Sequence, residues 1–183
     1  MSKDFFDIEL AGKKRKLPLF EVAPGLRIAV LNILGDTELV EACADKMADM
    51  LKTVDYDVMV TAESKSIPFI YALAVRTKKP YVVLRKSYKS YMGKALESKS
   101  NSITTQSEQH LILDEKDIPL IAGKNVLIVD DVISTGSTLN AIEDVMKQAG
   151  CNPGFKSAAI CVEGSENDWP NVLHLGRLPL FKS

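Results

Sequence analysis

Short apolar runs alternate with helix-period segments along most of this chain. The runs have the length and the β-branched content of buried strands, and they cover residues 57–61, 81–85, 126–129 and 157–162. The segments before or between them carry apolar residues at helical spacing and cover about 38–52, 66–77 and 139–149. This alternation predicts an α/β fold, a doubly wound and mostly parallel sheet with helices on both faces.

The predicted helices have clear start and stop signals. Asp36 and Thr37 are suited to cap the first helix, because their side-chain oxygens accept hydrogen bonds from free backbone N–H groups. Pro68 fits the first turn of the second helix, where proline is tolerated. Gly150 follows the last apolar position of the third, where a glycine with positive φ commonly ends a helix.

One segment, residues 87–109, breaks the alternation. It is rich in Ser, Lys, Thr and Gln and has almost no periodic apolar signal. A stretch of this length inside a compact domain is usually functional or disordered, so we expect a flexible loop here. The remaining pattern fits a single domain over residues 1–183, which is long enough for a sizeable core.

Composition narrows the class of protein. With 46% hydrophobic and 26% charged residues, the chain resembles a globular protein. A net charge of −1 gives no reason to expect nucleic acid or an anionic membrane as a partner. Cys43, Cys151 and Cys161 are scattered without metal spacing, which suits buried thiols in a reducing compartment. Without a leader pattern or a membrane-length apolar run, the expected location is the cytoplasm.

Candidate chemistry is concentrated where the run 126–129 ends. Asp130 and Asp131 follow it, and a loop of small hydroxyl residues, 134–138, leads into the next helix. Free N–H groups at a helix N-terminus bind anions, and small side chains let the backbone approach one. Because two aspartates repel a bare phosphate, the ligand should carry hydroxyls or a divalent cation beside its phosphate. A ribose 5-phosphate has this composition.

The run VLIVDDVISTGST resembles the phosphoribosyl pyrophosphate (PRPP) motif of the type I phosphoribosyltransferases, in which hydrophobic residues precede D-D-x-x-x-T-G-x-T. The resemblance implies that Asp130 and Asp131 are catalytic, bind the ribose hydroxyls and hold Mg²⁺. It also implies a cradle for the 5′-phosphate, formed by Ser134, Thr135, Gly136, Ser137 and Thr138. Members of this family are commonly dimeric, so a homodimer is expected.

Two further segments resemble the parts of this family that bind pyrophosphate. Glu63, Ser64 and Lys65 follow the first strand, where adenine members carry a turn such as E-S-R-G. The second segment supplies basic residues in the pattern R-K-x-x-K, namely Arg85, Lys86 and Lys89. Lysine in place of arginine keeps the charge but loses the planar fork for phosphate.

The segment 87–109 lies where type I members have a long loop that closes over the active site. Gln106 falls at the position of a loop glutamate of the adenine enzymes, but an amide cannot act as a general acid or base. Glu108, two residues further on, is therefore the candidate catalytic acid or base. The stretch TTQSE also resembles the loop of xanthine members.

The N-terminal segment, about residues 1–35, corresponds to the base-facing hood of the purine branch. The sequence PGLRIA resembles P-G-[VIL]-x-F-R of the adenine members, although the aromatic residue and the arginine are missing. By position, Ile28 would pack on the base, and the backbone of Arg27 and Ala29 would contact its edge. Val132 is the fourth residue assigned to the base site.

The predicted function is transfer of the phosphoribosyl group from PRPP to a purine base, with adenine favoured, giving a nucleoside monophosphate and pyrophosphate. Xanthine and hypoxanthine/guanine phosphoribosyltransferases remain alternatives, because the hood and loop patterns are mixed. A third alternative is a non-catalytic regulator that senses PRPP with the same fold. Such regulators usually carry a DNA-binding domain or a basic surface, and neither is visible in this sequence.

Overall fold

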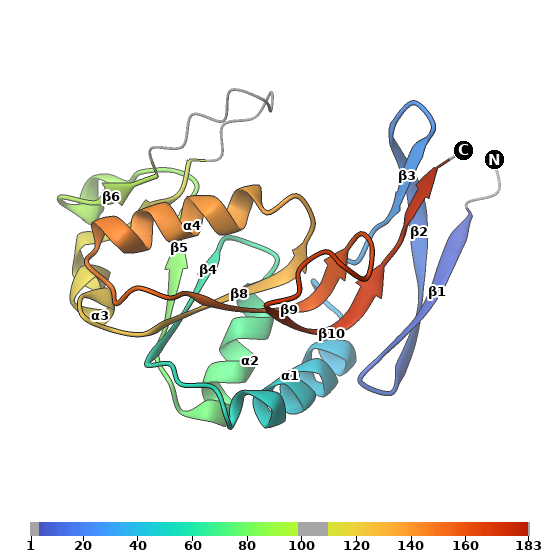
Figure 1. The fold of residues 1–183 in the computed structure, drawn as a ribbon. Helices are drawn as coiled ribbons and strands as arrows, with labels where there is room; N and C mark the ends of the chain where they lie inside the picture. The colour runs from blue at the N-terminus through green and yellow to red at the C-terminus, as the bar shows by residue number, and fades with distance from the viewer. Residues whose placement is uncertain (1–3, 99–109, 183) are drawn as a thin grey trace.

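The computed structural model describes residues 4–98 and 110–182 and centres on a five-stranded sheet (Figure 1). The strands lie in the order β10-β9-β8-β4-β5, and every neighbouring pair is parallel. Their bounds are β4 (Val58–Ala62), β5 (Tyr81–Leu84), β8 (Val126–Ile133), β9 (Lys156–Glu163) and β10 (Val172–Leu178). The predicted α/β class and parallel sheet are confirmed.

Helices cover both faces of this sheet. Helices α1 (Thr37–Leu51) and α2 (Ile67–Thr77) pack on one face, and α4 (Ser137–Gln148) packs on the other, with the short α3 (Ile118–Ile121) beyond it. Alternate residues of β8 divide between the two cores, as the two-residue period of a strand requires. Leu127 and Val129 join the α1–α2 core, whereas Val126 and Ile128 join the α4 core.

The predicted helix ends agree with the structure. Asp36 is the N-cap of α1 and its carboxylate accepts a hydrogen bond from the Leu39 N–H at 3.2 Å. Helix α2 carries Pro68 in its first turn. After α4, Gly150 has a φ of 76°, and the N–H of the next residue, Cys151, bonds to the Met146 carbonyl at 3.2 Å. Each of these ends is determined locally, so the sequence predicts it well.

Strand β8 is longer than expected. The sequence pattern ended the buried strand at residue 129, just before Asp130 and Asp131, but the strand continues to Ile133. Pairing with β9 explains the difference, because this ladder runs on to the pair Ile133–Val162. The two carboxylates therefore project from regular strand backbone, which fixes their positions more firmly than a loop would.

A second sheet forms the hood, and it is antiparallel, in the order β1-β2-β3-β11. Its strands are β1 (Phe5–Leu10), β2 (Lys13–Ala23), β3 (Leu26–Ala29) and β11 (Leu180–Lys182). The hairpin between β1 and β2 turns at Ala11 and Gly12, both with positive φ, as a tight two-residue turn requires. The hood is thus built from both ends of the chain, not from residues 1–35 alone.

The segment expected as a loop begins with ordered structure. Residues 87–98 contain the 3₁₀ turn η1 (Ser90–Met92) and the strand β6 (Leu96–Glu97), which pairs with β7 (Ile112–Leu113). Met92 anchors this part because its side chain is buried. A second 3₁₀ turn, η2 (Glu115–Asp117), leads into α3. Gln106 and Glu108 lie outside the described residues.

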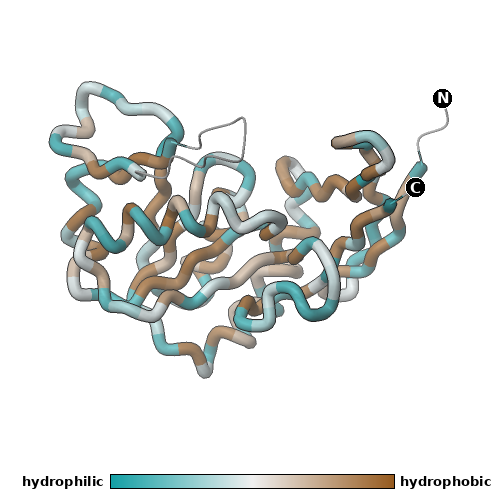
Figure 2. The backbone as a smooth tube through the Cα atoms, turned by 45° about the horizontal axis from the view of Figure 1, so that its top comes forward, coloured by the Kyte–Doolittle hydropathy of each residue, from teal (hydrophilic) through white to brown (hydrophobic). Residues whose placement is uncertain are grey.

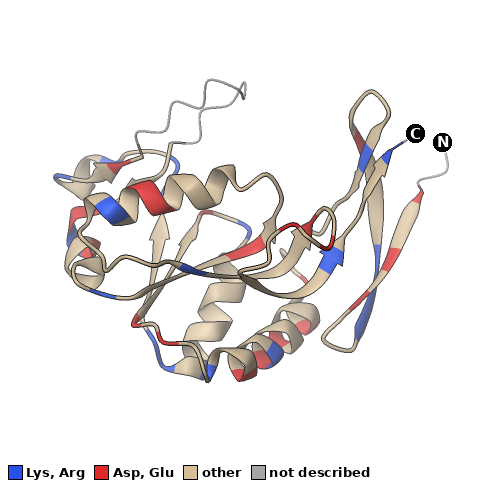
Figure 3. Ribbon diagram, viewed as in Figure 1, with Lys and Arg blue, Asp and Glu red and all other residues tan. Residues whose placement is uncertain are grey.

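The surface is mixed in charge and polarity. Apolar residues are concentrated in the central strands (Figure 2). Charged residues of both signs are interspersed along α1, α4 and the β1–β2 hairpin (Figure 3). Within residues 4–98 and 110–182, none of the helices has the length and hydropathy needed to span a membrane.

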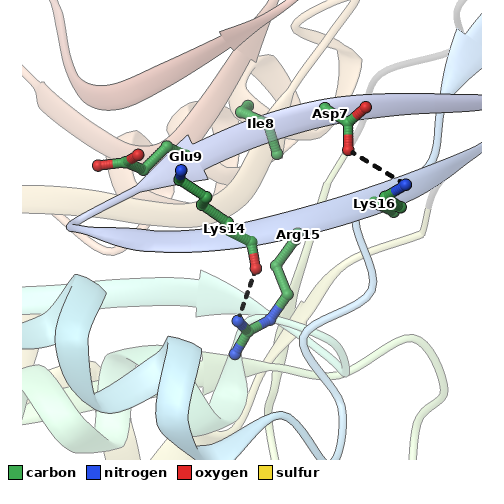
Figure 4. Close-up of a pocket in the computed structure, with 6 residues that line it drawn as sticks. All are labelled: Asp7, Ile8, Glu9, Lys14, Arg15 and Lys16. Atoms are coloured by element: carbon green, nitrogen blue, oxygen red, sulfur yellow. Dashed lines mark hydrogen bonds and ion pairs between the residues drawn. The ribbon is translucent and has the colours of Figure 1, made fainter.

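Arg15 ties the hood to the main body. It lies in the wall of a cavity of about 600 Å³ that is lined by paired residues of β1 and β2 (Figure 4), and it forms a bidentate ion pair with Asp36. The Arg15 Nε–Asp36 Oδ2 and Nη2–Oδ1 distances are 2.7 and 2.8 Å. Asp36 therefore caps α1 and anchors β2 at the same time.

We expect Asp36→Ala to lower the free energy of unfolding by about 1–2 kcal/mol at neutral pH, since it removes a helix cap and an ion pair. The hydrogen bond from Arg15 lowers the pKa of Asp36, so its contribution is present above the unfolded pKa and is lost as the pH falls through the lower folded pKa. Urea unfolding at pH 7 and near pH 3 measures this. Equal losses at both pH values would contradict it, and Asp49→Asn, on the exposed side of α1, is the control.

Candidate active site

The carboxyl end of β8 holds two carboxylates in contact with one buried hydroxyl. Ser66 Oγ lies 2.7 Å from Asp130 Oδ1 and 3.0 Å from Asp131 Oδ1, and it accepts a hydrogen bond from the Asp131 N–H at 2.9 Å. Ser66 is the N-cap residue of α2 but makes no side-chain cap bond there. Its hydroxyl is instead used to fix the acidic pair.

The sequence pattern missed this role of Ser66 and treated it only as the start of a helix. The available signal was its place directly after β4, since the carboxyl ends of neighbouring parallel strands meet at one edge of the sheet. Strands β4 and β8 are such neighbours, with Val60 opposite Ile128.

Lys65 supplies the cation nearest to the acidic pair. Its Nζ lies 2.9 Å from Asp131 Oδ2 and donates to the Leu31 carbonyl at 3.2 Å. Asp131 Oδ2 is buried, and no donor among the described residues makes an aligned hydrogen bond to it. The charge of Lys65 alone holds this oxygen. It is therefore able to bind a further cation or to accept a hydrogen bond.

The environment of Asp130 works against its charged form. Burial raises the pKa of Asp130 above the usual aspartate value, and the neighbouring Asp131 carboxylate raises it further, while the hydrogen bond from Ser66 opposes both. Two adjacent acids, of which Asp131 is buried, favour a ligand that brings positive charge or hydroxyl donors.

A small recess follows the acidic pair. It has a volume of about 30 Å³ and is lined by the loop 134–136, the first residues of α4 and the end of β8 at Asp130, Val132 and Ile133. Gly136, with a φ of 79°, turns the chain into α4, whose first N–H groups face this recess. Small side chains at a helix N-terminus suit an anion. All of the residues predicted as a phosphate cradle line it: Ser134, Thr135, Gly136, Ser137 and Thr138.

A larger cavity of about 310 Å³ lies on the other side of the acids. It shares Asp130, Val132 and Thr138 with the small recess, so the two are neighbours. Its walls come from the ends of β4, β5 and β8 and the start of α4, and the predicted site residues among them are Glu63, Ser64, Lys65, Lys86, Asp130, Asp131, Val132 and Thr138. The peptide bond between Glu63 and Ser64 is cis.

Arg85 and Lys89 are not brought to this cavity. Arg85 Nε pairs with Glu63 Oε2 at 2.6 Å and the side chain lines a separate cavity of about 420 Å³. Burial opposes ionisation of Glu63, but hydrogen bonds from the Lys86 N–H and Arg85 hold the pKa of this carboxyl below its usual value. Lys89 is exposed at the start of η1. Arg85 thus fixes Glu63 rather than facing the cavity of the acidic pair.

A third cavity, of about 760 Å³, lies between the hood and the C-terminal ends of β8 and β9. Of the residues predicted to contact a base, Ile28 lines it and Val132 lies in the neighbouring recess. Arg27 instead forms an ion pair with Asp4 at 2.7 Å, and Ala29 is buried. Strand β3 pairs with β2 along residues 26–29 and with β11 along residues 26–28. The Arg27 position is therefore paired on both edges of the strand, whereas Ala29 is paired with β2 alone.

Trp169 joins this third cavity to the phosphate-sized recess. Its indole N–H donates to the Glu163 carbonyl at 3.1 Å, which anchors the side chain. The ring also covers Gly136 so closely that a Cβ there would lie 2.6 Å from it. Trp169 therefore both packs and forms cavity wall, a role that depends on contacts between distant segments.

Comparison with known proteins agrees with this arrangement. A family model described as "Phosphoribosyl transferase domain" matches residues 30–170. An adenine phosphoribosyltransferase of Malacoplasma penetrans is 33% identical over 124 residues, covering 66% of this chain and 67% of that protein. A hypoxanthine/guanine phosphoribosyltransferase of Methanotorris igneus is 39% identical over 120 residues, covering 64% and 61%.

Solved structures support the fold. An adenine phosphoribosyltransferase from Thermoanaerobacter pseudethanolicus superposes with a TM-score of 0.65 at 18% identity and covers 95% of both chains. The enzyme from Trypanosoma brucei, in complex with AMP, pyrophosphate and ribose-5-phosphate, gives a TM-score of 0.64 at 21% identity, covering 82% of this chain and 70% of that one.

Proposed function

Because this chain belongs to the phosphoribosyltransferase family, we propose that it transfers the 5-phosphoribosyl group of PRPP to a purine base, with adenine preferred. One observation carries the proposal: Asp130 and Asp131 lie between a helix N-terminus suited to a phosphate and a cavity that contains Lys65 and Lys86. A sugar with phosphate groups at both ends matches this order of charges.

The 5′-phosphate is proposed to occupy the recess of residues 134–138, where the N–H groups that begin α4 and the hydroxyls donate to its oxygens. The ribose then lies over Asp130 and Asp131, whose carboxylates accept hydrogen bonds from the sugar hydroxyls. Ser66 holds both carboxylates in place, so their orientation is set before the substrate arrives.

The pyrophosphate is proposed to lie in the 310 Å³ cavity near Lys65 and Lys86. A nitrogen of the base forms a bond to C1 of the ribose, while the bond from C1 to the pyrophosphate oxygen breaks and its electron pair leaves with pyrophosphate. Positive charge develops on the sugar next to the two carboxylates, and negative charge develops on the leaving group next to the lysines. The base loses one proton, and Glu108 remains the predicted acceptor.

Mg²⁺ is the proposed cofactor, and the acidic pair fits it. The described residues contain no cluster of three or more acidic, His or Cys ligands, so the protein alone offers too few ligands for a tight cage. Mg²⁺ is commonly held by one or two carboxylates together with substrate phosphates and water. Asp130 and Asp131, with the unaligned Oδ2 of Asp131, would supply those carboxylates. When bound, the metal would neutralise charge on the pyrophosphate.

We favour adenine over the other candidate bases on two grounds. The hood sequence PGLRIA resembles the adenine members, and adenine phosphoribosyltransferases stand among the relatives with the widest coverage. Hypoxanthine/guanine enzymes are also among the relatives and form the second candidate, with xanthine behind them. A PRPP sensor that binds DNA is not favoured, because charges of both signs are interspersed along the fold (Figure 3).

A panel of bases tests the choice. We expect kcat/KM with saturating PRPP and Mg²⁺ to be at least about tenfold higher for adenine than for hypoxanthine, guanine or xanthine, the discrimination that one hydrogen bond supplies. Monophosphate formation is followed by chromatography. A preference for a 6-oxopurine would replace adenine with the second candidate.

Thr135→Ala tests where the 5′-phosphate binds. The change removes one hydroxyl from the recess but keeps the backbone, so we expect KM for PRPP to rise about tenfold and KM for adenine to change less than twofold. Steady-state kinetics with each substrate varied in turn measures both constants. The reverse pattern would move the phosphate site elsewhere, and Thr77→Ala, at the end of α2, is a threonine control remote from the recess.

We also propose a cytoplasmic homodimer, as is common in the family. Sedimentation velocity on the purified chain tests the assembly, with a species of about 40 kDa expected from the 20.1 kDa monomer. A purely monomeric, active enzyme would contradict the dimer.

A further inference from the structure

Glu163 is the last residue of β9, and its side chain lines the 760 Å³ cavity between hood and core. Across the described residues its carboxylate has neither a hydrogen-bond nor an ion-pair partner. The other carboxylate in the cavity wall, Asp168, is already engaged, because its Oδ2 accepts from the N–H and the hydroxyl of Ser165 at 2.6 and 2.9 Å. Glu163 is therefore the acid in this wall whose hydrogen-bonding capacity is unused.

The position of Glu163 is fixed by the backbone around it. Its carbonyl accepts the indole N–H of Trp169, and the next residue, Gly164, donates to the Leu178 carbonyl at 3.0 Å. The parallel pairing of β9 with β10 places Leu178 opposite Glu163 and holds the backbone there. A side chain at the end of a central strand, held in this way, is suited to discriminate between ligands.

The opposite wall is apolar and comes from the hood. Ile28 of β3 lies across from Leu180 of β11, and Val22 and Leu26 continue the same wall. Val22 and Leu180 are both exposed large hydrophobic residues. A flat aromatic ring would cover this wall, and Ser134 and Thr135 at the edge of the cavity connect it to the phosphate recess.

An unpaired carboxylate in such a cavity is stabilised when a ligand donates a hydrogen bond to it. Burial raises the pKa of Glu163, which shows that its charged form is poorly solvated there. A ligand N–H that donates to Glu163 would offset the loss of water, whereas a ligand carbonyl at the same place would face another acceptor. A carboxylate acceptor in this wall therefore favours an amino substituent over an oxo substituent.

We propose that Glu163 determines base specificity by accepting a hydrogen bond from the exocyclic amino group of adenine. The inference rests on the proposed function and adds the residue responsible for the preference. Hypoxanthine has the same ring system but carries an oxygen in place of that amino group, so it loses the hydrogen bond and meets a repelling acceptor.

The test compares Glu163→Leu and Glu163→Gln with the wild type, using adenine and hypoxanthine as matched bases. We expect Glu163→Leu to lower kcat/KM for adenine about 30-fold and for hypoxanthine less than threefold, since a hydrogen bond to a charged group has this order of effect. Glu163→Gln keeps an acceptor oxygen and should retain more adenine activity than Glu163→Leu. Glu166→Gln, an exposed acid in the same turn, should match the wild type.

A readout on PRPP keeps the result interpretable. The rise in melting temperature on adding PRPP with Mg²⁺ should be equal in all the variants, because Glu163 does not line the phosphate recess. Equal losses for adenine and hypoxanthine in Glu163→Leu would overturn the inference. If the wild type turns over no base, the proposed function fails instead. Calorimetric binding of adenine to wild type and Glu163→Leu then decides the inference alone, and equal affinities would refute it.

Discussion

Changing Asp130 and Asp131 together to asparagine should abolish phosphoribosyl transfer, with a loss of at least about 10³-fold in kcat, while the fold survives. The loss follows because both carboxylates are placed to stabilise positive charge on the ribose, and single preorganised charges of this kind contribute about 10²–10³-fold. Asparagine keeps the size of each side chain, and Ser66 can still donate to an amide oxygen.

The same variant should be at least as stable as the wild type. Asp131 is buried, and the pKa of its neighbour Asp130 is raised. The two charges together destabilise the folded state, so neutralising them removes an unfavourable interaction. Lys65 loses its ion pair with Asp131, but its side chain is 42% exposed and can be solvated. Turnover and thermal unfolding are measured on one preparation. Full activity would contradict the proposed roles, and a collapse of the melting temperature would show a structural role instead.

Gly136→Ala should raise KM for PRPP about 100-fold. The residue has a φ of 79°, which L-residues rarely adopt, and a Cβ would lie 2.6 Å from the ring of Trp169. The loop or the indole must therefore move, which displaces the hydroxyls and N–H groups of the phosphate recess.

Gly123→Ala separates the effect of a strained φ from the effect of the close contact with Trp169. Gly123 also has a positive φ, 69°, but a Cβ there meets no atom within 4 Å, and the residue is far from the site in sequence and fold. It should cost stability without changing KM. Adding Trp169→Ala to Gly136→Ala removes the close contact but not the φ strain, so a partial recovery of KM is expected. An unchanged KM in Gly136→Ala alone would show that the recess does not bind PRPP.

The sequence predicted the parts of the site that are contiguous along the chain. Asp130, Asp131 and the hydroxyl loop form one uninterrupted segment, so strand, acids and helix N-terminus are adjacent whatever the rest of the fold does. The helix ends at Asp36 and Gly150 were equally local. What was predicted poorly was the exact end of β8, because it depends on pairing with β9.

The features that were missed depend on distant segments. Ser66 contacts acids more than 60 residues away, and Trp169 covers a glycine of another loop. The strand β11 joins the hood by pairing three C-terminal residues with β3, which no pattern in either segment predicts. Arg85 was expected to face pyrophosphate because the R-K-x-x-K pattern resembles the family, but its partner in the structure is Glu63, which follows the neighbouring strand β4.

The strand pairing of the hood also changes which groups of PGLRIA face the cavity. The resemblance pointed to the backbone of the PGLRIA segment, yet β3 is paired on both edges and presents side chains such as Ile28 to the cavity. Polar recognition then comes from the opposite wall, where Glu163 lies. The fold was thus predictable from the motif, whereas the wall of the 760 Å³ cavity depends on the assembled hood.

The most direct test of the central claim is a product balance. The purified chain is incubated with Mg²⁺, adenine and PRPP, and AMP and pyrophosphate are quantified in the same sample. We predict equal amounts of the two products, formed only when base and PRPP are both present. Pyrophosphate released without AMP would indicate hydrolysis of PRPP, and no release at all despite PRPP binding would contradict the assignment of a transferase.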